Sequence, residues 1–197
     1  MSDRNLPHTH AFFAEQTEAI LAAKSKLADE RRRWLGTTMG EPVPVGDYAL
    51  TNADGSAVSF RDLFGSQRDL LVVHNMGRSC PYCTMWADGF IGLARHLERR
   101  AAFVLTSPDP APVIKAFAAE RGWPFRCVSI HGTTFARDLG FEPTPGNFHP
   151  GVSGFHLQED GTIHRTGASR FGPGDDFCAA WPMFGLLRGA EASFVPK

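Results

Sequence analysis

The feature that most constrains this chain is an apolar run followed by two closely spaced cysteines. Residues 70–76, Leu-Leu-Val-Val-His-Asn-Met, are typical of a buried strand. Cys80-Pro81-Tyr82-Cys83 comes soon after this run, and Thr84 to Arg100 then carry apolar residues at helical spacing. We therefore expect a strand, a short loop and a helix, with the cysteine pair at the start of the helix.

A cysteine pair in this position suits dithiol–disulfide chemistry. The first turn of a helix has unpaired N–H groups and the positive end of the helix dipole, and both favour a thiolate at Cys80. Cys83 is one turn further on, where it can attack a mixed disulfide formed at Cys80. Pro81 suits the first helical turn because its missing N–H is no loss there. The sequence predicts Cys80 as the nucleophile and Cys83 as the resolving thiol.

Two other uses of a Cys-x-x-Cys pair stay open but are less favoured. A zinc site usually takes a second close-spaced ligand pair, whereas Cys127 and Cys178 stand alone and far apart. A structural disulfide across so short a loop would constrain the unfolded chain little. We therefore expect redox activity, with no metal and no bound organic cofactor.

Composition places the chain among ordinary globular proteins. Its 197 residues are 43% hydrophobic, which is enough for a sizeable core. The net charge of −1 gives no overall attraction to nucleic acid or to an anionic membrane. The sequence lacks an apolar run long enough to span a membrane, and its N-terminus is too polar for a signal peptide. Four cysteines do not make a disulfide framework here, so we expect a reducing cytoplasm.

The N-terminal part is predicted to be a helical extension over residues 1–40. Apolar residues seven apart describe one face of a helix over Thr9 to Trp34. These residues are Phe13, Ile20, Leu27 and Trp34. A coiled coil that binds a partner would show the same pattern, but packing on its own domain is favoured because the pattern is short. A linker with two prolines at residues 40–46 then leads into a second domain, residues 41–197.

The second domain is predicted to be α/β, with a mixed central sheet flanked by helices. Before the motif strand we expect a hairpin over Tyr48 to Phe60 and a helical turn at Arg61 to Phe64. After the cysteine pair we expect a strand at Ala101 to Ser107, a helix ending at Gly122, an extended segment from Trp123 to Ile130 and a short helix at Thr134 to Leu139. The last predicted elements are a hairpin over Val152 to Thr166 and a final helix within Asp176 to Leu187 that contains Pro182.

Together these elements and the Cys-Pro-Tyr-Cys motif resemble the thioredoxin-like fold. The segment from Phe155 to Ile163 looks like the late hairpin of thiol–disulfide reductases and peroxiredoxin-like proteins. More narrowly, the chain is similar to a bacterial family of unknown function that is commonly labelled as predicted dithiol–disulfide oxidoreductases. The residues that carry this similarity are the cysteine pair, Trp86-Ala87-Asp88-Gly89-Phe90, Arg121-Gly122-Trp123-Pro124-Phe125, Val128-Ser129, and Gly151-Val152-Ser153 with Phe155. The resemblance runs from about residue 10 to residue 190.

The resemblance implies a thiol–disulfide oxidoreductase that acts on a disulfide-bearing protein or a small thiol substrate. A thioredoxin- or glutathione-type donor would supply the electrons, and a homodimer is conceivable. Val152 takes the position of the cis-proline with which thioredoxins place a partner disulfide, and Pro150 lies two residues earlier. Peroxiredoxins have Pro and Thr or Ser at the positions held here by Val73 and Gly77. A thiol peroxidase and a non-enzymatic redox-sensing or binding module remain the alternatives.

Several residues near the motif are candidates for supporting roles. Arg78 could lower the pKa of Cys80 or hold a glutathione carboxylate, unless it is a solvated loop residue. Asp88 could accept a proton or cap local structure. Tyr82 completes a Pro-Tyr dipeptide found in many glutaredoxins, whereas Trp86 could line a substrate surface but is more typical of a core.

Other polar and sulfur-containing residues are given simpler roles. His74, in the motif strand, is favoured as a hydrogen-bonded core histidine over a proton shuttle. Cys127 lies in an apolar strand and is expected to be buried and inert. Cys178 could be a third redox thiol only if the C-terminal element folds back over the site. The glycine-rich stretch from Arg170 to Asp176 is interpreted as an ordinary turn.

Overall fold

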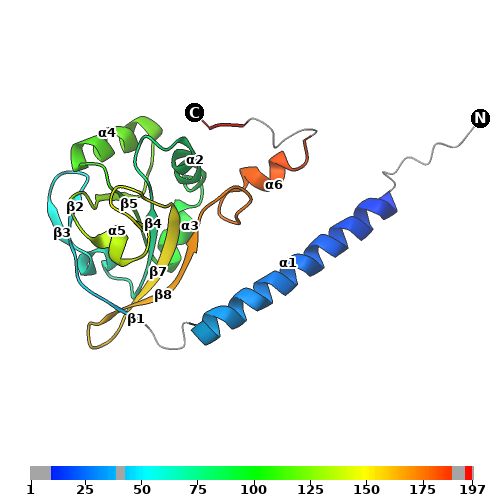
Figure 1. The fold of residues 1–197 in the computed structure, drawn as a ribbon, viewed down its shortest axis with the longest axis horizontal. Coiled ribbons are helices and arrows are strands. Elements are labelled where there is room, and N and C mark those ends of the chain that lie inside the picture. Colours follow the sequence, from blue (N-terminus) through cyan, green and yellow to red (C-terminus); the bar gives the residue numbers. More distant parts are fainter. Residues whose placement is uncertain (1–9, 39–42, 188–193, 197) are drawn as a thin grey trace, which may run out of the picture. The chain divides into compact units, whose positions relative to one another are not determined.

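A computed structural model describes residues 10–38, 43–187 and 194–196 (Figure 1). The chain divides into two units, Met1–Pro42 and Val43–Lys197. In the first unit, the helix α1 (His10–Thr38) extends four residues beyond the predicted end at Trp34. Ile20 and Leu27 of its predicted apolar face are 54% and 48% exposed. The side chains of Phe13 and Trp34 lie outside the described residues, so the role of this face stays a prediction.

The second unit is built on one mixed sheet with the order β1-β8-β7-β4-β5-β6-β2-β3. Its strands are β1 (Val43–Val45), β2 (Ala49–Asn52), β3 (Ala57–Ser59), β4 (Asp69–His74), β5 (Ala102–Ser107), β6 (Arg126–Ser129), β7 (Gly151–Leu157) and β8 (Ile163–Arg170). The central strands β4, β5 and β6 are parallel, while β7 pairs antiparallel with both β4 and β8. The predicted mixed sheet flanked by helices, with a helix before it, is confirmed.

Six helical segments accompany these strands in the described part of the second unit. They are η1 (Arg61–Phe64), α2 (Pro81–Gly89), α3 (Ala94–Arg100), α4 (Ala111–Arg121), α5 (Phe135–Asp138) and α6 (Ala180–Phe184). Among the helices that the structure describes, none is both long and apolar enough to cross a membrane.

The sheet separates two hydrophobic clusters. Alternate residues of β4 face opposite sides, so Val72 packs in one cluster with Phe60 and Phe135, and Val73 packs in the other. The second cluster also contains Trp86 of α2 and side chains of α3 and α4. The cysteine-pair helix is therefore anchored to the core along its length.

Two local predictions were wrong, and a third was right in position but not in length. The helix expected over Thr84 to Arg100 is two helices, because Phe90 begins a turn in which its N–H donates to the carbonyl of Ala87 instead of continuing the α-helical ladder. The expected linker contains β1, which pairs with β8 and tolerates Pro44 because it is an edge strand. The final helix lies within Asp176 to Leu187 as predicted, but α6 covers only Ala180–Phe184.

Candidate functional site: the cysteine pair at the start of α2

The loop between β4 and α2 is held by several hydrogen bonds. The Asn75 N–H donates to the carbonyl of Thr106 at 2.9 Å, and the Asn75 side chain accepts from the Gly77 N–H at 2.7 Å. Gly77 has a φ of 101°, which strongly favours glycine. The Arg78 N–H then donates to Oδ2 of Asp109 at 2.7 Å. These contacts fix the path of the chain up to Cys80.

Cys80 is the N-cap residue of α2. Its Sγ accepts a hydrogen bond from the Cys83 N–H at 3.1 Å, and Pro81 occupies the first helical turn as predicted. Both cysteines are free thiols in this structure, Cys80 half-buried and Cys83 only 3% exposed. The first sulfur is thus accessible and the second lies beneath it.

The two thiols have opposite pKa shifts. The hydrogen bond from the Cys83 thiol, helped by the backbone N–H groups of Cys83 and Tyr82, lowers the pKa of Cys80 to about 6 against the opposing effect of burial. The same hydrogen bond and burial raise the pKa of Cys83 above its usual range. At neutral pH, the arrangement favours a thiolate at Cys80 and keeps the proton on Cys83.

Arg78 does not account for the lowered pKa of Cys80. The causes of that shift all lie within the Cys80–Cys83 segment. The Arg78 side chain is exposed, and its backbone N–H is its contact with Asp109. Its position fits the alternative of a solvated loop arginine.

Asp88 and Trp86 serve the packing of α2. Asp88 forms an ion pair with Arg121 of α4 and accepts a hydrogen bond from the Trp123 indole N–H at 2.8 Å. Trp86 is 2% exposed and packs in the core, so it does not line an open surface. These contacts favour structural roles for Asp88 and Trp86 over roles in proton transfer or substrate binding.

Val152 lies close to the end of the motif strand, as the resemblance implies. It is the partner of Val73 in the β4–β7 ladder, and Gly151 is the partner of His74. The described part of the chain has no cis peptide bond. The Val152 position is therefore beside the site but has ordinary trans backbone in place of the thioredoxin cis-proline.

His74 and Cys127 have the predicted core positions. His74 is 3% exposed, its Nε2 shares a 2.9 Å hydrogen bond with Oγ of Ser153, and its ring stacks on Phe141 at 3.8 Å between centroids. Burial, with a smaller effect from the Arg165 charge, lowers the pKa of His74 to about 3. Burial raises the pKa of Cys127 to about 12, so this thiol is unreactive at neutral pH.

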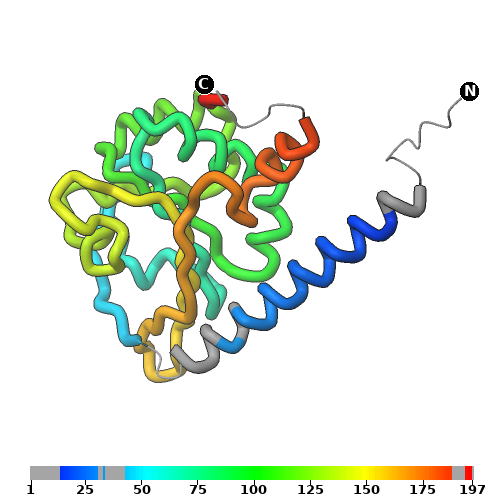
Figure 2. The backbone as a smooth tube through the Cα atoms, turned by 45° about the vertical axis from the view of Figure 1, so that its right-hand side comes forward, coloured from blue at the N-terminus to red at the C-terminus, as the bar shows by residue number. Residues whose placement is uncertain are grey.

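Asp175 ties the C-terminal segment to α2, a role that the sequence reasoning missed. Its Oδ1 accepts from the Trp86 indole N–H at 3.3 Å and from the N–H groups of Phe177 and Cys178 at 2.8 and 3.1 Å. Its Oδ2 accepts from the Gly172 N–H at 2.9 Å. The stretch is a turn, as predicted, in which the Asp175 N–H donates to the Gly172 carbonyl at 3.0 Å. It is also an anchor, and the tube in Figure 2 shows the orange segment beside the green helices. Gly172, Pro173 and Gly174 signal the turn, but nothing local in the sequence signals the contact of Asp175 with Trp86.

The position of Cys178 bears on whether it could be a third redox thiol. The C-terminal element does fold back beside α2, where Cys178 packs in the cluster that contains Trp86 and Phe171. The thiol is only 6% exposed, however. Its burial therefore limits access by a substrate.

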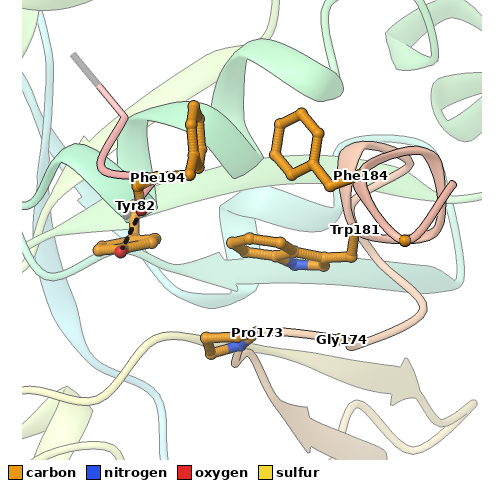
Figure 3. A pocket seen from close by; sticks show the side chains of 7 residues that line it. Tyr82, Pro173, Gly174, Trp181, Phe184 and Phe194 are labelled. Carbon is orange, nitrogen blue, oxygen red and sulfur yellow. Dashed lines mark hydrogen bonds between the residues drawn. The ribbon is translucent and has the colours of Figure 1, made fainter. Parts of the chain in front are cut away.

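A cavity of about 430 Å³ lies between Tyr82 of α2 and the C-terminal segment (Figure 3). Tyr82 forms one wall, with its ring stacked near Trp181 at 6.2 Å between centroids. The Tyr82 hydroxyl donates to the carbonyl of Phe194 at 3.1 Å. The lining residues are Tyr82, Pro173, Gly174, Trp181, Phe184, Gly185 and Phe194. Sequence reasoning marked Tyr82 but not its aromatic neighbours.

No set of three or more histidine, cysteine or acidic side chains in the described ranges is grouped so that it could hold a metal ion.

The mixed sheet, with the cysteine pair at the start of the helix that follows its central strand, has the thioredoxin-like fold. The chain belongs to the family described as bacterial protein of unknown function (DUF899), which matches residues 8–187. A search of curated proteins found no significant match.

Similar solved structures support the assignment of the fold. Peroxidoxin BcpB from Mycobacterium tuberculosis is 24% identical, with a TM-score of 0.51 over 62% of this chain and 80% of that one. An uncharacterized conserved protein from Geobacillus kaustophilus is 20% identical, with a TM-score of 0.50 over 68% of this chain and 69% of that one. A peroxiredoxin-like protein from Aquifex aeolicus is 10% identical, with a TM-score of 0.50 over 66% and 74%. At these identities the likeness concerns the fold alone.

Proposed function

We propose that this protein is a thiol–disulfide oxidoreductase with Cys80 as nucleophile and Cys83 as resolving thiol. The observation that carries this proposal is the opposite shift of the two pKa values across one helical turn. Cys80, half-buried, has a pKa of about 6, while Cys83 is buried and its pKa is raised. An accessible thiolate beside a protonated second thiol is the arrangement that disulfide exchange requires.

The reaction balances with the two thiols of the pair and one substrate disulfide. The Cys80 thiolate attacks one substrate sulfur, a mixed disulfide forms and the other substrate sulfur leaves as a thiolate. Cys83 then loses its proton and attacks Sγ of Cys80, which forms the Cys80–Cys83 disulfide and releases the second substrate thiolate. The substrate gains two electrons, and a thioredoxin- or glutathione-type thiol would return the protein to the dithiol.

Peroxide reduction is the second candidate, favoured only by the likeness of the fold to peroxiredoxins. The residue three positions before Cys80 is Gly77, whose φ of 101° disfavours any β-branched residue. A Cβ there would lie 3.1 Å from Oδ2 of Asp109. The threonine or serine that peroxiredoxins use at this position could not be accommodated without a change of backbone. Disulfide exchange is therefore the preferred reaction.

The proposal is tested by trapping. A Cys83→Ser variant should form a stable mixed disulfide through Cys80 with a disulfide-bearing substrate, because the resolving attack is lost. The Cys80→Ser variant should form none, and Cys127→Ser is the matched control that should behave as the wild type. Mass spectrometry of the trapped species identifies the bonded cysteine.

Either of two results would contradict the proposal and favour a different function. Rapid peroxide consumption by wild-type protein that leaves disulfides untouched would make the protein a thiol peroxidase. Stoichiometric oxidation of the pair without turnover, accompanied by altered self-association, would instead make it a redox-sensing module.

A further inference from the structure

We propose that the cavity beside Tyr82 binds an apolar side chain, preferably aromatic, next to the disulfide of a protein substrate. This inference rests on the proposed function and names its substrate class. The cavity of about 430 Å³ falls in the size range of ligand-binding pockets. Its described lining consists of uncharged residues, and four of them are aromatic: Tyr82, Trp181, Phe184 and Phe194.

The chemistry of the lining selects among possible occupants. Glutathione carries two carboxylates and an ammonium group, which proteins hold with charged side chains or convergent hydrogen bonds. Among the residues that the structure describes, those that line this cavity offer no charged side chain. Aromatic rings instead provide apolar area and edge or face contacts for another aromatic ring. An apolar side chain of a protein substrate therefore fits the cavity better than glutathione does.

The position of Tyr82 links the cavity to the reacting sulfurs. Tyr82 lies between Cys80 and Cys83 in sequence, in the first turn of α2, and it also lines the cavity. A side chain held against Tyr82 would thus belong to a residue close to the attacked disulfide. Holding it there brings the disulfide within reach of Cys80 and lowers the entropic cost of the encounter.

Two phenylalanines of the C-terminal segment complete the far side of the cavity. The rings of Phe184 and Phe194 lie 4.6 Å apart between centroids (Figure 3). Phe184 is half-buried and Phe194 is 43% exposed, so both keep surface for a ligand. The Tyr82 hydroxyl, bonded to the Phe194 carbonyl at 3.1 Å, holds the two walls together before a substrate arrives. Phe184 is therefore the residue best suited to determine specificity.

The experiment compares two short peptides that differ only in the residue after their single cysteine, phenylalanine or serine. Each cysteine is joined through a disulfide to 2-mercaptoethanol, and quenched mass spectrometry measures the rate constant for reaction with the reduced protein. We expect wild-type protein to react about ten-fold faster with the phenylalanine peptide, the size of effect that burial of one aromatic side chain can supply.

Two matched variants test whether the cavity causes the preference for the phenylalanine peptide. Phe184→Ser should reduce it to less than about three-fold through a slower reaction with the phenylalanine peptide, while the rate with the serine peptide stays unchanged. Phe177→Ser, an exposed phenylalanine of the same segment that does not line the cavity, should keep the full preference. Equal rates with both peptides in the wild type, or the same loss of preference in both variants, would overturn this inference. Either result would leave the proposed function standing. If neither peptide reacts at all, the proposed function fails and this inference falls with it.

Discussion

At the scale of single residues, one hydrogen bond between the two thiols shifts their pKa values in opposite directions. The Cys83 thiol stabilises a charge on Cys80, and the charge in turn holds the proton on Cys83. Because both effects arise inside one helical turn, Cys80, the proposed nucleophile, does not need a separate base. The exposed Arg78 side chain is also unnecessary for its activation.

Alkylation of Cys80 should therefore follow the thiolate population. With a pKa of about 6, Cys80 is mostly thiolate at pH 7, and its reaction with limiting iodoacetamide should rise through pH 6 and level off above pH 7. Cys127, whose pKa is about 12, should stay unlabelled in the folded protein. Peptide mapping after labelling between pH 4 and pH 9 measures both. A midpoint near 8.5, the ordinary value for a thiol, would contradict the assignment.

The roles of individual residues were predictable where they depend on the neighbouring sequence. The cysteine pair and the buried His74 follow from a strand–loop–helix pattern that spans only a few residues. Asp175 and Trp181 could not be found in this way, because their partners Trp86 and Tyr82 are distant in sequence and meet them only after folding. Local spacing did not decide whether Asp88 accepts a proton or supports local structure. Its ion pair with Arg121 favours the structural role.

At the scale of elements, prediction succeeded where a turn residue marks a boundary. The first hairpin turns at Asn52 to Gly55, and α4 ends at Gly122, which adopts the left-handed conformation. The break between α2 and α3 was missed although Gly89 and Gly92 lie there, because Met85, Phe90, Leu93 and Leu97 keep a helical spacing across it. Neither glycine adopts a positive φ. The three-residue β1 was hidden by Pro44, which normally argues against a strand.

The loop before α2 should tolerate only glycine at position 77. Gly77→Ala places a Cβ on a residue with a φ of 101° and 3.1 Å from Oδ2 of Asp109. We expect a loss of about 1–3 kcal/mol in the free energy of unfolding, measured by urea denaturation of the reduced protein. Gly92→Ala is the matched control, because a Cβ there meets nothing within 4 Å, and its effect should stay within about 0.5 kcal/mol. Equal effects of the two substitutions would show that the loop is not constrained at Gly77.

At the scale of the whole molecule, the buried histidine joins separate parts of the second unit. His74 ends β4, bonds Ser153 of β7 and stacks on Phe141, which follows α5. A charge on this ring would be buried at the junction of all three. The stability of the entire unit thus depends on His74 remaining neutral.

This dependence predicts how global stability changes with pH. The pKa of His74 is about 3 in the folded protein and 6.5 when unperturbed, so the unfolded chain binds the proton more readily. Stability should fall as the pH drops from about 6.5 towards 3, by up to about 1.4 kcal/mol per pH unit from this group. Urea denaturation of wild-type protein and His74→Gln at several pH values isolates the contribution. The variant should lose stability less steeply with acid, and parallel curves would refute the role of His74.

The two edges of the sheet have a consequence for the protein at high concentration. An unpaired strand edge is a template on which another molecule can add a strand and begin to aggregate. Here the edge strands β1 and β3 have three residues each, and Pro44 in the middle of β1 has no N–H to donate. Neither edge offers a long row of free backbone groups. The proline that concealed β1 from sequence reasoning is thus also a safeguard against fibrous self-assembly.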